Sequence, residues 1–107
     1  MKEYYKAIAD FHKKFEMKGT NNEEMTFRLN LMTEELGELA QAVTKGKGKK
    51  AIVEENIDLL NLIIGNFVSL EISSEEIKKA FWEKHKKLMS REKKLVNGKN
   101  FRISEFK

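Results

Sequence analysis

The chain has 107 residues and a mass of 12.5 kDa, which suits one domain and leaves no room for a separate cofactor domain. It lacks cysteine, which excludes disulfides, thiolate metal sites and cysteine nucleophiles. Its net charge of +4 keeps nucleic-acid binding open as an interpretation. No apolar run approaches the roughly 18 residues of a membrane span. We therefore expect a cytoplasmic protein that does not enter membranes.

Proline is absent and glycine is scarce, a composition that indicates a mostly helical chain. Periodic apolar segments predict helices at about residues 3–18, 22–45, 51–71 and 74–94. A basic, glycine-containing loop at 45–50 separates the second helix from the third, and Asn97-Gly98 predicts a short C-terminal hairpin or arm. The predicted fold class is all-α, of the four-helix-bundle type, with one domain over residues 1–107 and a tail over about 95–107.

The second predicted helix has two apolar faces. One face is a strict heptad seam, formed by Met25, Leu29, Met32, Leu36, Leu39 and Val43. The other face is interrupted by acids at Glu34, Glu35 and Glu38. We interpret the seam as core, with a dimer interface as the alternative for part of it, because so short a chain buries a modest core.

The third predicted helix is apolar around nearly its whole circumference, which is typical of a central, buried helix. What remains is a narrow polar stripe formed by Glu54, Asp58, Asn61 and Gly65, with Glu55 on its margin. We therefore expect these polar side chains to face a cavity inside the fold.

Two acidic motifs lie on these neighbouring helices, EExxE at residues 34–38 and ExxD at residues 55–58. Side chains three or four residues apart share a helix face, so each helix can present two carboxylates to the same gap. Buried carboxylates repel one another unless a cation compensates them, and all-oxygen ligation favours Mg²⁺ or Mn²⁺. Either motif alone is more typical of a solvated helix face, but the pair favours a metal site. Nearby basic residues, in the 45–50 loop and the fourth helix, would then hold phosphate charge.

These motifs resemble those of the MazG-like all-α nucleoside-triphosphate pyrophosphohydrolases, a superfamily that also includes phosphoribosyl-ATP pyrophosphohydrolase and dimeric dUTPases. The resemblance covers about residues 8–91 and includes FHxxF at 11–15 and DLLxxxxG at 58–65. The resemblance continues over residues 83–91, with two departures. Leu88 stands where the small phage and bacterial branch of the superfamily usually has Asn, and Arg91 stands where it usually has Lys. The leucine removes an amide suited to ribose or base, whereas the arginine keeps a charge suited to phosphate.

The resemblance implies Mg²⁺-dependent hydrolysis of a nucleoside triphosphate between its α and β phosphates, with Mn²⁺ as a substitute metal. The metal ligands that it implies are Glu35, Glu38, Glu55 and Asp58. Glu34 would orient or deprotonate the attacking water. The residues expected to bind substrate are Arg28, Asn61, Lys50, Lys84 and Arg91. A homodimer is expected, with a tetramer as the alternative, and the expected role is house-cleaning of the nucleotide pool.

Two other functions are compatible with the sequence. One is the same fold specialised for phosphoribosyl-ATP, and the other is a non-enzymatic basic helical module that binds nucleic acid or a partner. Residues 1–77 carry 10 Lys/Arg and 14 Asp/Glu, whereas residues 78–107 carry 11 and 3. This division fits a metal–polyphosphate site lined by both signs of charge better than a uniformly basic surface, so nucleic acid is not an expected partner.

Overall fold

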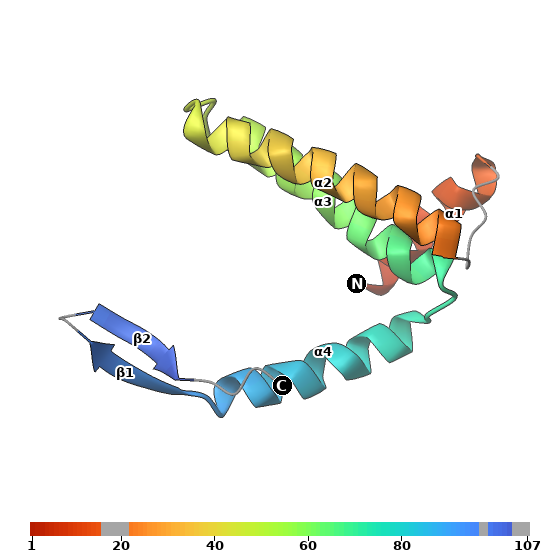
Figure 1. Ribbon diagram of the computed structural model, residues 1–107. Helices are drawn as coiled ribbons and strands as arrows, with labels where there is room; N and C mark the ends of the chain where they lie inside the picture. Colours follow the sequence, from red (N-terminus) through yellow and green to blue (C-terminus); the bar gives the residue numbers. More distant parts are fainter. Residues whose placement is uncertain (16–21, 97–98, 104–107) are drawn as a thin grey trace. The chain divides into compact units, whose positions relative to one another are not determined.

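The computed structural model describes residues 1–15, 22–96 and 99–103, with side chains described for 1–15 and 25–91. The elements in chain order are α1 (Lys2–Lys14), α2 (Asn22–Thr44), α3 (Lys49–Ser69), α4 (Ser74–Met89), β1 (Glu92–Val96) and β2 (Lys99–Ile103) (Figure 1). The predicted all-α class with four helices is confirmed. The chain divides into two compact units, Met1–Ser74 and Glu75–Lys107, which are described separately.

In the first unit, α2 and α3 form an antiparallel helical hairpin, and α1 packs against α3 (Figure 1). The turn between α2 and α3 contains Gly46 and Gly48, whose φ angles are 62° and 93°. Residues with a side chain rarely adopt such angles, so these two glycines allow the short connection that folds α3 back along α2. Because α3 contacts both other helices of the unit, it is the central helix, as predicted. It is not the buried helix that its apolar surface predicted, because Val53 and Ile57 are about half exposed.

The face of α2 that packs against α3 is the face that carries the acids. Ala42 and Arg28 on this face are only 1% and 2% exposed, whereas Leu29 and Leu36 of the heptad seam are each 56% exposed. The interpretation of the whole seam as core is therefore wrong for the described chain. The physical reason is that α3 turns Glu55 and Asp58 toward α2, which brings the acids of both helices together and leaves much of the seam facing outward. Glu54, which belongs to the same predicted stripe, is exposed instead.

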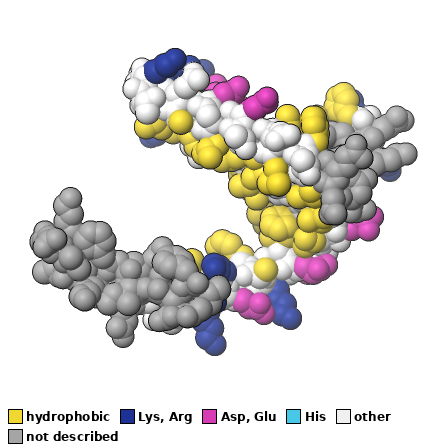
Figure 2. Space-filling view, viewed as in Figure 1, with side chains coloured by type: hydrophobic (Ala, Val, Ile, Leu, Met, Phe, Trp, Pro, Cys, Tyr) yellow, Lys and Arg dark blue, Asp and Glu magenta, His cyan; other side chains and the backbone are white. Residues whose placement is uncertain are grey.

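Apolar side chains remain widely exposed in the first unit. Figure 2 shows them gathered along one face of its helices, and on α3 both Val53 and Ile57 are about half exposed. Among the described apolar residues of this unit, Ala42 and Ile64 are the ones that are buried. In the described part of the chain, no single helix is both long and apolar enough to cross a membrane. The required length and hydropathy are reached only when α3 and α4 are taken together, and these two helices are separated by a sharp bend.

The second unit contains α4 and a two-stranded antiparallel hairpin, which confirms the predicted C-terminal hairpin. Its register runs from Glu92 opposite Ile103 to Val96 opposite Lys99. The predicted helix to about residue 94 ends instead at Met89, because the backbone of Glu92–Val96 pairs with β2. The turn predicted at Asn97-Gly98 lies outside the described residues.

Candidate metal centre and adjoining pocket

Four carboxylates converge between α2 and α3. Glu35 and Glu38 come from α2, and Glu55 and Asp58 come from α3. One carboxylate oxygen of each residue lies within 4.8 Å of the corresponding oxygens of the other three. The spacing of three residues within each pair places both carboxylates on one helix face, and the antiparallel hairpin sets the two faces opposite each other. The structure thus brings together all four residues that the sequence indicated as metal ligands.

The cluster is electrostatically unfavourable without a cation. The pKa of Glu35 is raised above its ordinary value, first by burial and then by the charges of Glu38 and Asp58. The pKa of Glu55 is raised by burial and by the same two carboxylates, against a smaller opposing effect of Lys47. The Oε2 atoms of Glu35 and Glu55 are buried and accept no hydrogen bond from any described residue. Buried, unpartnered carboxylate oxygens beside other carboxylates fit a hard divalent cation.

We expect the metal-free protein to become more stable as the pH falls. Because the pKa values of Glu35 and Glu55 are raised above 4.5 in the folded state, the folded protein binds protons more tightly than the unfolded chain does. This stabilisation is fully present below pH 4.5 and is lost as the pH rises through the raised pKa values. Thermal unfolding in the presence of a chelator, across a pH series, measures the effect.

The variant Glu55→Gln should be more stable than the wild type at pH 7 without metal, and it should lose part of this pH dependence. Glu54→Gln is the matched control, because Glu54 is an exposed neighbour that lies outside the cluster. Equal pH dependence of unfolding in the wild type and in Glu55→Gln would contradict the predicted sign and origin of the effect.

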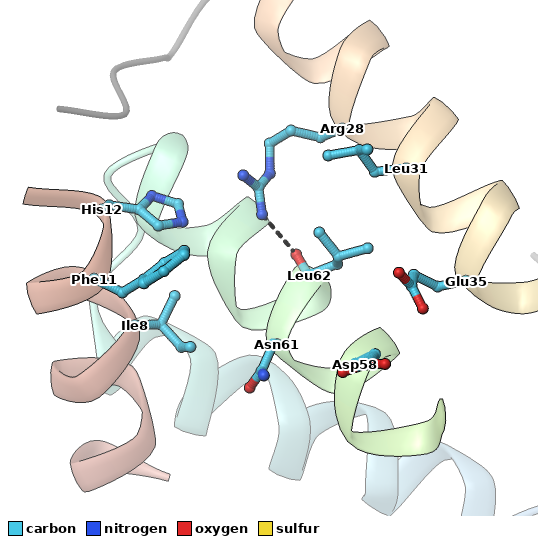
Figure 3. Close-up of a pocket in the computed structure, with 9 residues that line it drawn as sticks. All are labelled: Ile8, Phe11, His12, Arg28, Leu31, Glu35, Asp58, Asn61 and Leu62. Carbon is cyan, nitrogen blue, oxygen red and sulfur yellow. Dashed lines mark hydrogen bonds between the residues drawn. The ribbon is translucent and has the colours of Figure 1, made fainter. Parts of the chain in front are cut away.

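A pocket of about 410 Å³ opens beside the carboxylates (Figure 3). All three helices of the first unit contribute to it, and its walls are formed by Ile8, Phe11, His12, Arg28, Leu31, Glu35, Asp58, Asn61 and Leu62. The side chains of α1 face those of α2 and α3 across the pocket, with Glu35 and Asp58 at the edge away from His12 (Figure 3). Its volume lies within the roughly 300–1,000 Å³ range of small-molecule sites. Apolar walls with polar groups at the edges suit a nucleoside whose phosphates reach the carboxylates.

Arg28 forms the inner wall of this pocket and is nearly inaccessible to solvent, at 2% exposed. Its Nε donates to Oδ1 of Asn66 at 2.7 Å, and its Nη2 donates to the carbonyl oxygen of Leu62 at 3.1 Å. The guanidinium lies against Gly65, where any Cβ atom would overlap Nη2. A glycine inside a helix costs about 1 kcal/mol relative to alanine, and here it makes room for the arginine.

The other predicted site residues lie in different surroundings. Glu34 is exposed on α2 next to Glu35, outside the cluster of four, and Asn61 lines the pocket. Lys50 is exposed in the first turn of α3. Lys84 is exposed on α4, and Arg91, which is partly exposed, follows α4 in the second unit.

The contribution of α1 to the pocket was missed as a functional feature of the sequence. The FHxxF motif at residues 11–15 contains Phe11 and His12, but the prediction of the site rests on the acidic motifs, which do not include them. His12 is 5% exposed and lines the pocket with Phe11. The FHxxF match was the available signal, because it contains both Phe11 and His12.

A helical hairpin that carries four convergent carboxylates beside a pocket of this size fits a divalent-metal centre next to a small-molecule site. The sequence profile of the phosphoribosyl-ATP pyrophosphohydrolase family matches residues 1–85, so the chain belongs to this family. The family is part of the MazG-like superfamily, which confirms the resemblance and makes the protein a nucleotide pyrophosphohydrolase. Comparisons with curated proteins and with solved structures gave no match.

Proposed function

We propose that the protein hydrolyses a ribo- or deoxyribonucleoside triphosphate between the α and β phosphates, in a Mg²⁺-dependent reaction that gives a nucleoside monophosphate and pyrophosphate. The observation that carries this proposal is the cluster of four carboxylates at the edge of a nucleoside-sized pocket. A triphosphate extending from the pocket would bring its phosphate groups close to these carboxylates, which would hold a divalent cation. Removal of unwanted nucleotides from the cellular pool is the proposed role.

In this mechanism Glu35, Glu38, Glu55 and Asp58 hold the metal, and the unpartnered Oε2 atoms of Glu35 and Glu55 are ready acceptors for it. A Mg²⁺ ion held there would supply positive charge for the phosphate oxygens and lower the pKa of water. Glu34 lies next to Glu35 and is exposed, so its carboxylate can orient the attacking water and accept a proton from it. Water supplies the oxygen that joins the nucleotide product, and pyrophosphate leaves. Mn²⁺ is proposed as a substitute for Mg²⁺.

Substrate binding is proposed to involve both the pocket and basic residues. Asn61 lines the pocket on the same helix as Asp58 and carries an amide suited to base or sugar, while Arg28 forms the inner wall. Lys50, Lys84 and Arg91 would compensate the remaining negative charge of the triphosphate, because all three are positively charged. Lys50 and Lys84 are exposed and Arg91 is partly exposed, so a ligand in solvent can reach them.

The family match favours phosphoribosyl-ATP as a second candidate substrate, because the matched profile is that of phosphoribosyl-ATP pyrophosphohydrolase. The bond cleaved and the metal chemistry would be the same. The two candidate substrates differ in the groups attached to the base. In the proposed binding mode, the pocket or its mouth would have to accommodate these groups. Leu88 on α4 offers no amide for either ligand.

Product analysis with a panel of nucleoside triphosphates, deoxynucleoside triphosphates and phosphoribosyl-ATP tests the proposal. We expect monophosphate and pyrophosphate from at least one triphosphate with Mg²⁺, and no inorganic phosphate. Cleavage of phosphoribosyl-ATP alone would establish the second candidate. Absence of turnover with every compound in Mg²⁺ and in Mn²⁺ would overturn both, and a salt-dependent shift of DNA or RNA without metal would then indicate a binding module.

Three further properties are proposed for the intact protein. Both units act as one enzyme domain, because the family match continues past Ser74 to residue 85 of the second unit. The protein forms a homodimer, or a tetramer built from dimers, because Leu29, Leu36 and Val43 leave an apolar seam exposed on α2. Sedimentation analysis measures the assembly.

The cytoplasm is the proposed location, where nucleotide substrates are found, and neither membranes nor nucleic acids are expected partners.

A further inference from the structure

Arg28 connects α2 to α3 at two points. Its Nε–H donates to the side chain of Asn66 at 2.7 Å, and its Nη2–H donates to the backbone of Leu62 at 3.1 Å. Asn66 in turn donates through Nδ2 to the sulfur of Met32 on α2 at 3.1 Å. The connection therefore runs from α2 to α3 and back to α2. Because the guanidinium is planar and rigid, bonds to two acceptors fix both its position and its orientation.

Gly65 provides the space that this arrangement requires. A Cβ atom at position 65 would overlap Nη2 of Arg28 and lie 3.0 Å from its Cζ atom. It would also lie 3.0 Å from Nε2 of His12, on α1. The tip of a flexible side chain usually moves away from such an overlap, but this guanidinium is buried and held by two hydrogen bonds. Any larger residue at position 65 must therefore displace the arginine or separate the helices.

The connection lies along the same helix contact as the carboxylates. Arg28 precedes Glu35 by seven residues, which is about two turns on one face of α2. Leu62 follows Asp58 by four residues, which is about one turn on one face of α3. A rotation or sliding of α2 against α3 that breaks the contacts of Arg28 must also change the distance between the two pairs of carboxylates.

We propose that Arg28, seated in the gap left by Gly65, is a positioning residue for the metal centre. It fixes the rotation and offset of α2 against α3 so that the carboxylates from the two helices converge within binding distance of one cation. This inference rests on the proposed function for its catalytic consequence, but its effect on cation binding is independent of any substrate. It assigns Arg28 a role through the helix contact, as the alternative to its predicted contact with substrate.

The test measures Mn²⁺ affinity by electron paramagnetic resonance on the full-length protein, in the wild type and in Arg28→Lys, Asn66→Ala and Gly65→Ala. Circular dichroism verifies that each variant is folded. Each variant is expected to bind Mn²⁺ at least about tenfold more weakly, which is the lower end of the loss seen when a group that orients a metal ligand is removed. Asn66→Ala keeps both the arginine and the glycine, so it remains informative if another variant does not fold.

Gly37→Ala is the matched control for Gly65→Ala. Both substitutions add one methyl group inside a helix, but a Cβ at position 37 meets no other atom within 4 Å. Gly37→Ala should therefore keep the wild-type Mn²⁺ affinity.

The double variant Gly65→Ala/Arg28→Lys should bind Mn²⁺ no more weakly than Arg28→Lys alone, because lysine lacks the Nη2 atom that the new methyl group would overlap.

Turnover separates positioning from direct substrate contact. If Arg28 acts through the metal site, saturating Mn²⁺ should restore most of kcat in Arg28→Lys and leave the KM for nucleotide unchanged. A raised KM that excess Mn²⁺ does not correct, together with wild-type Mn²⁺ affinity, would overturn the inference and leave the proposed function intact. If the wild type hydrolyses no nucleotide, the Mn²⁺ titrations still decide the inference, and wild-type affinity in all three variants would overturn it.

Discussion

Replacing Glu38 by glutamine or Asp58 by asparagine is expected to abolish nucleotide hydrolysis while leaving the protein folded. Each substitution keeps the size of the side chain but removes a charged oxygen from the cluster of four. Loss of a group that merely orients a metal ligand costs about 10–100-fold in affinity or activity, so loss of a ligand should cost more than about 100-fold. Pyrophosphate release at saturating Mg²⁺ measures the effect, and circular dichroism measures the fold.

The control for these substitutions is Glu54→Gln, which removes the same charge from an exposed position one residue before Glu55. It should keep nearly full turnover, because Glu54 does not belong to the cluster. Metal-free Glu38→Gln should be at least as stable as the wild type, because the charge of Glu38 raises the pKa of both Glu35 and Glu55. Full turnover by both Glu38→Gln and Asp58→Asn would show that the metal assignment is wrong.

Divalent metal is expected to produce the largest change in stability. A ligand that binds only the folded state stabilises it by about 2.7 kcal/mol at 100 times its Kd. For a domain of about 100 residues this corresponds to a rise in Tm of about 10–20 °C. Mg²⁺ and Mn²⁺ should therefore raise the Tm of the wild type strongly, because they also relieve the repulsion among the carboxylates. Differential scanning calorimetry with and without metal measures the rise.

Sodium chloride at equal ionic strength is the control, because it screens surface charge without occupying the cluster. The rise in Tm should be much smaller with NaCl, and it should nearly disappear for Mg²⁺ in the Asp58→Asn variant. An equal rise with NaCl and MgCl₂ would mean that the metal acts by screening alone. That result would contradict specific binding between α2 and α3.

Helix number and approximate boundaries were predictable from the sequence, because hydrophobic periodicity and the glycine-containing breaks are local signals. The choice of the packed face of α2 was not predictable in the same way. The heptad of Leu29, Leu36 and Val43 gave the stronger apolar signal, yet these side chains are exposed. A pattern of apolar residues does not reveal that Glu55 and Asp58 of α3 lie against the other face of α2, which has the weaker apolar pattern and carries Glu35 and Glu38. The end of α4 was missed because strand pairing with Lys99–Ile103 depends on a segment later in the chain.

The four carboxylates were predictable because their spacing on two helices and their cost of burial both indicated a divalent-metal site. The contact that forms the inner wall of the pocket could not be predicted from the sequence. Gly65 was predicted only as part of the polar stripe of α3, and the structure shows that its neighbour is the guanidinium of Arg28. These two residues are far apart in sequence, and neither residue type by itself predicts a partner. The placement of Lys84 and Arg91 toward substrate stays a prediction.

The helical hairpin of α2 and α3 has a consequence for how substrate preference can change over evolution. All four carboxylates, together with Arg28 and Gly65, lie on these two helices, whereas Phe11 and His12 on the opposite wall belong to α1. Under the proposed function, reaction chemistry and one side of substrate recognition are thus carried by separate segments of the chain. Substitutions in α1 can reshape the pocket while the carboxylates keep their places, so new nucleotide preferences can arise without rebuilding the catalytic apparatus.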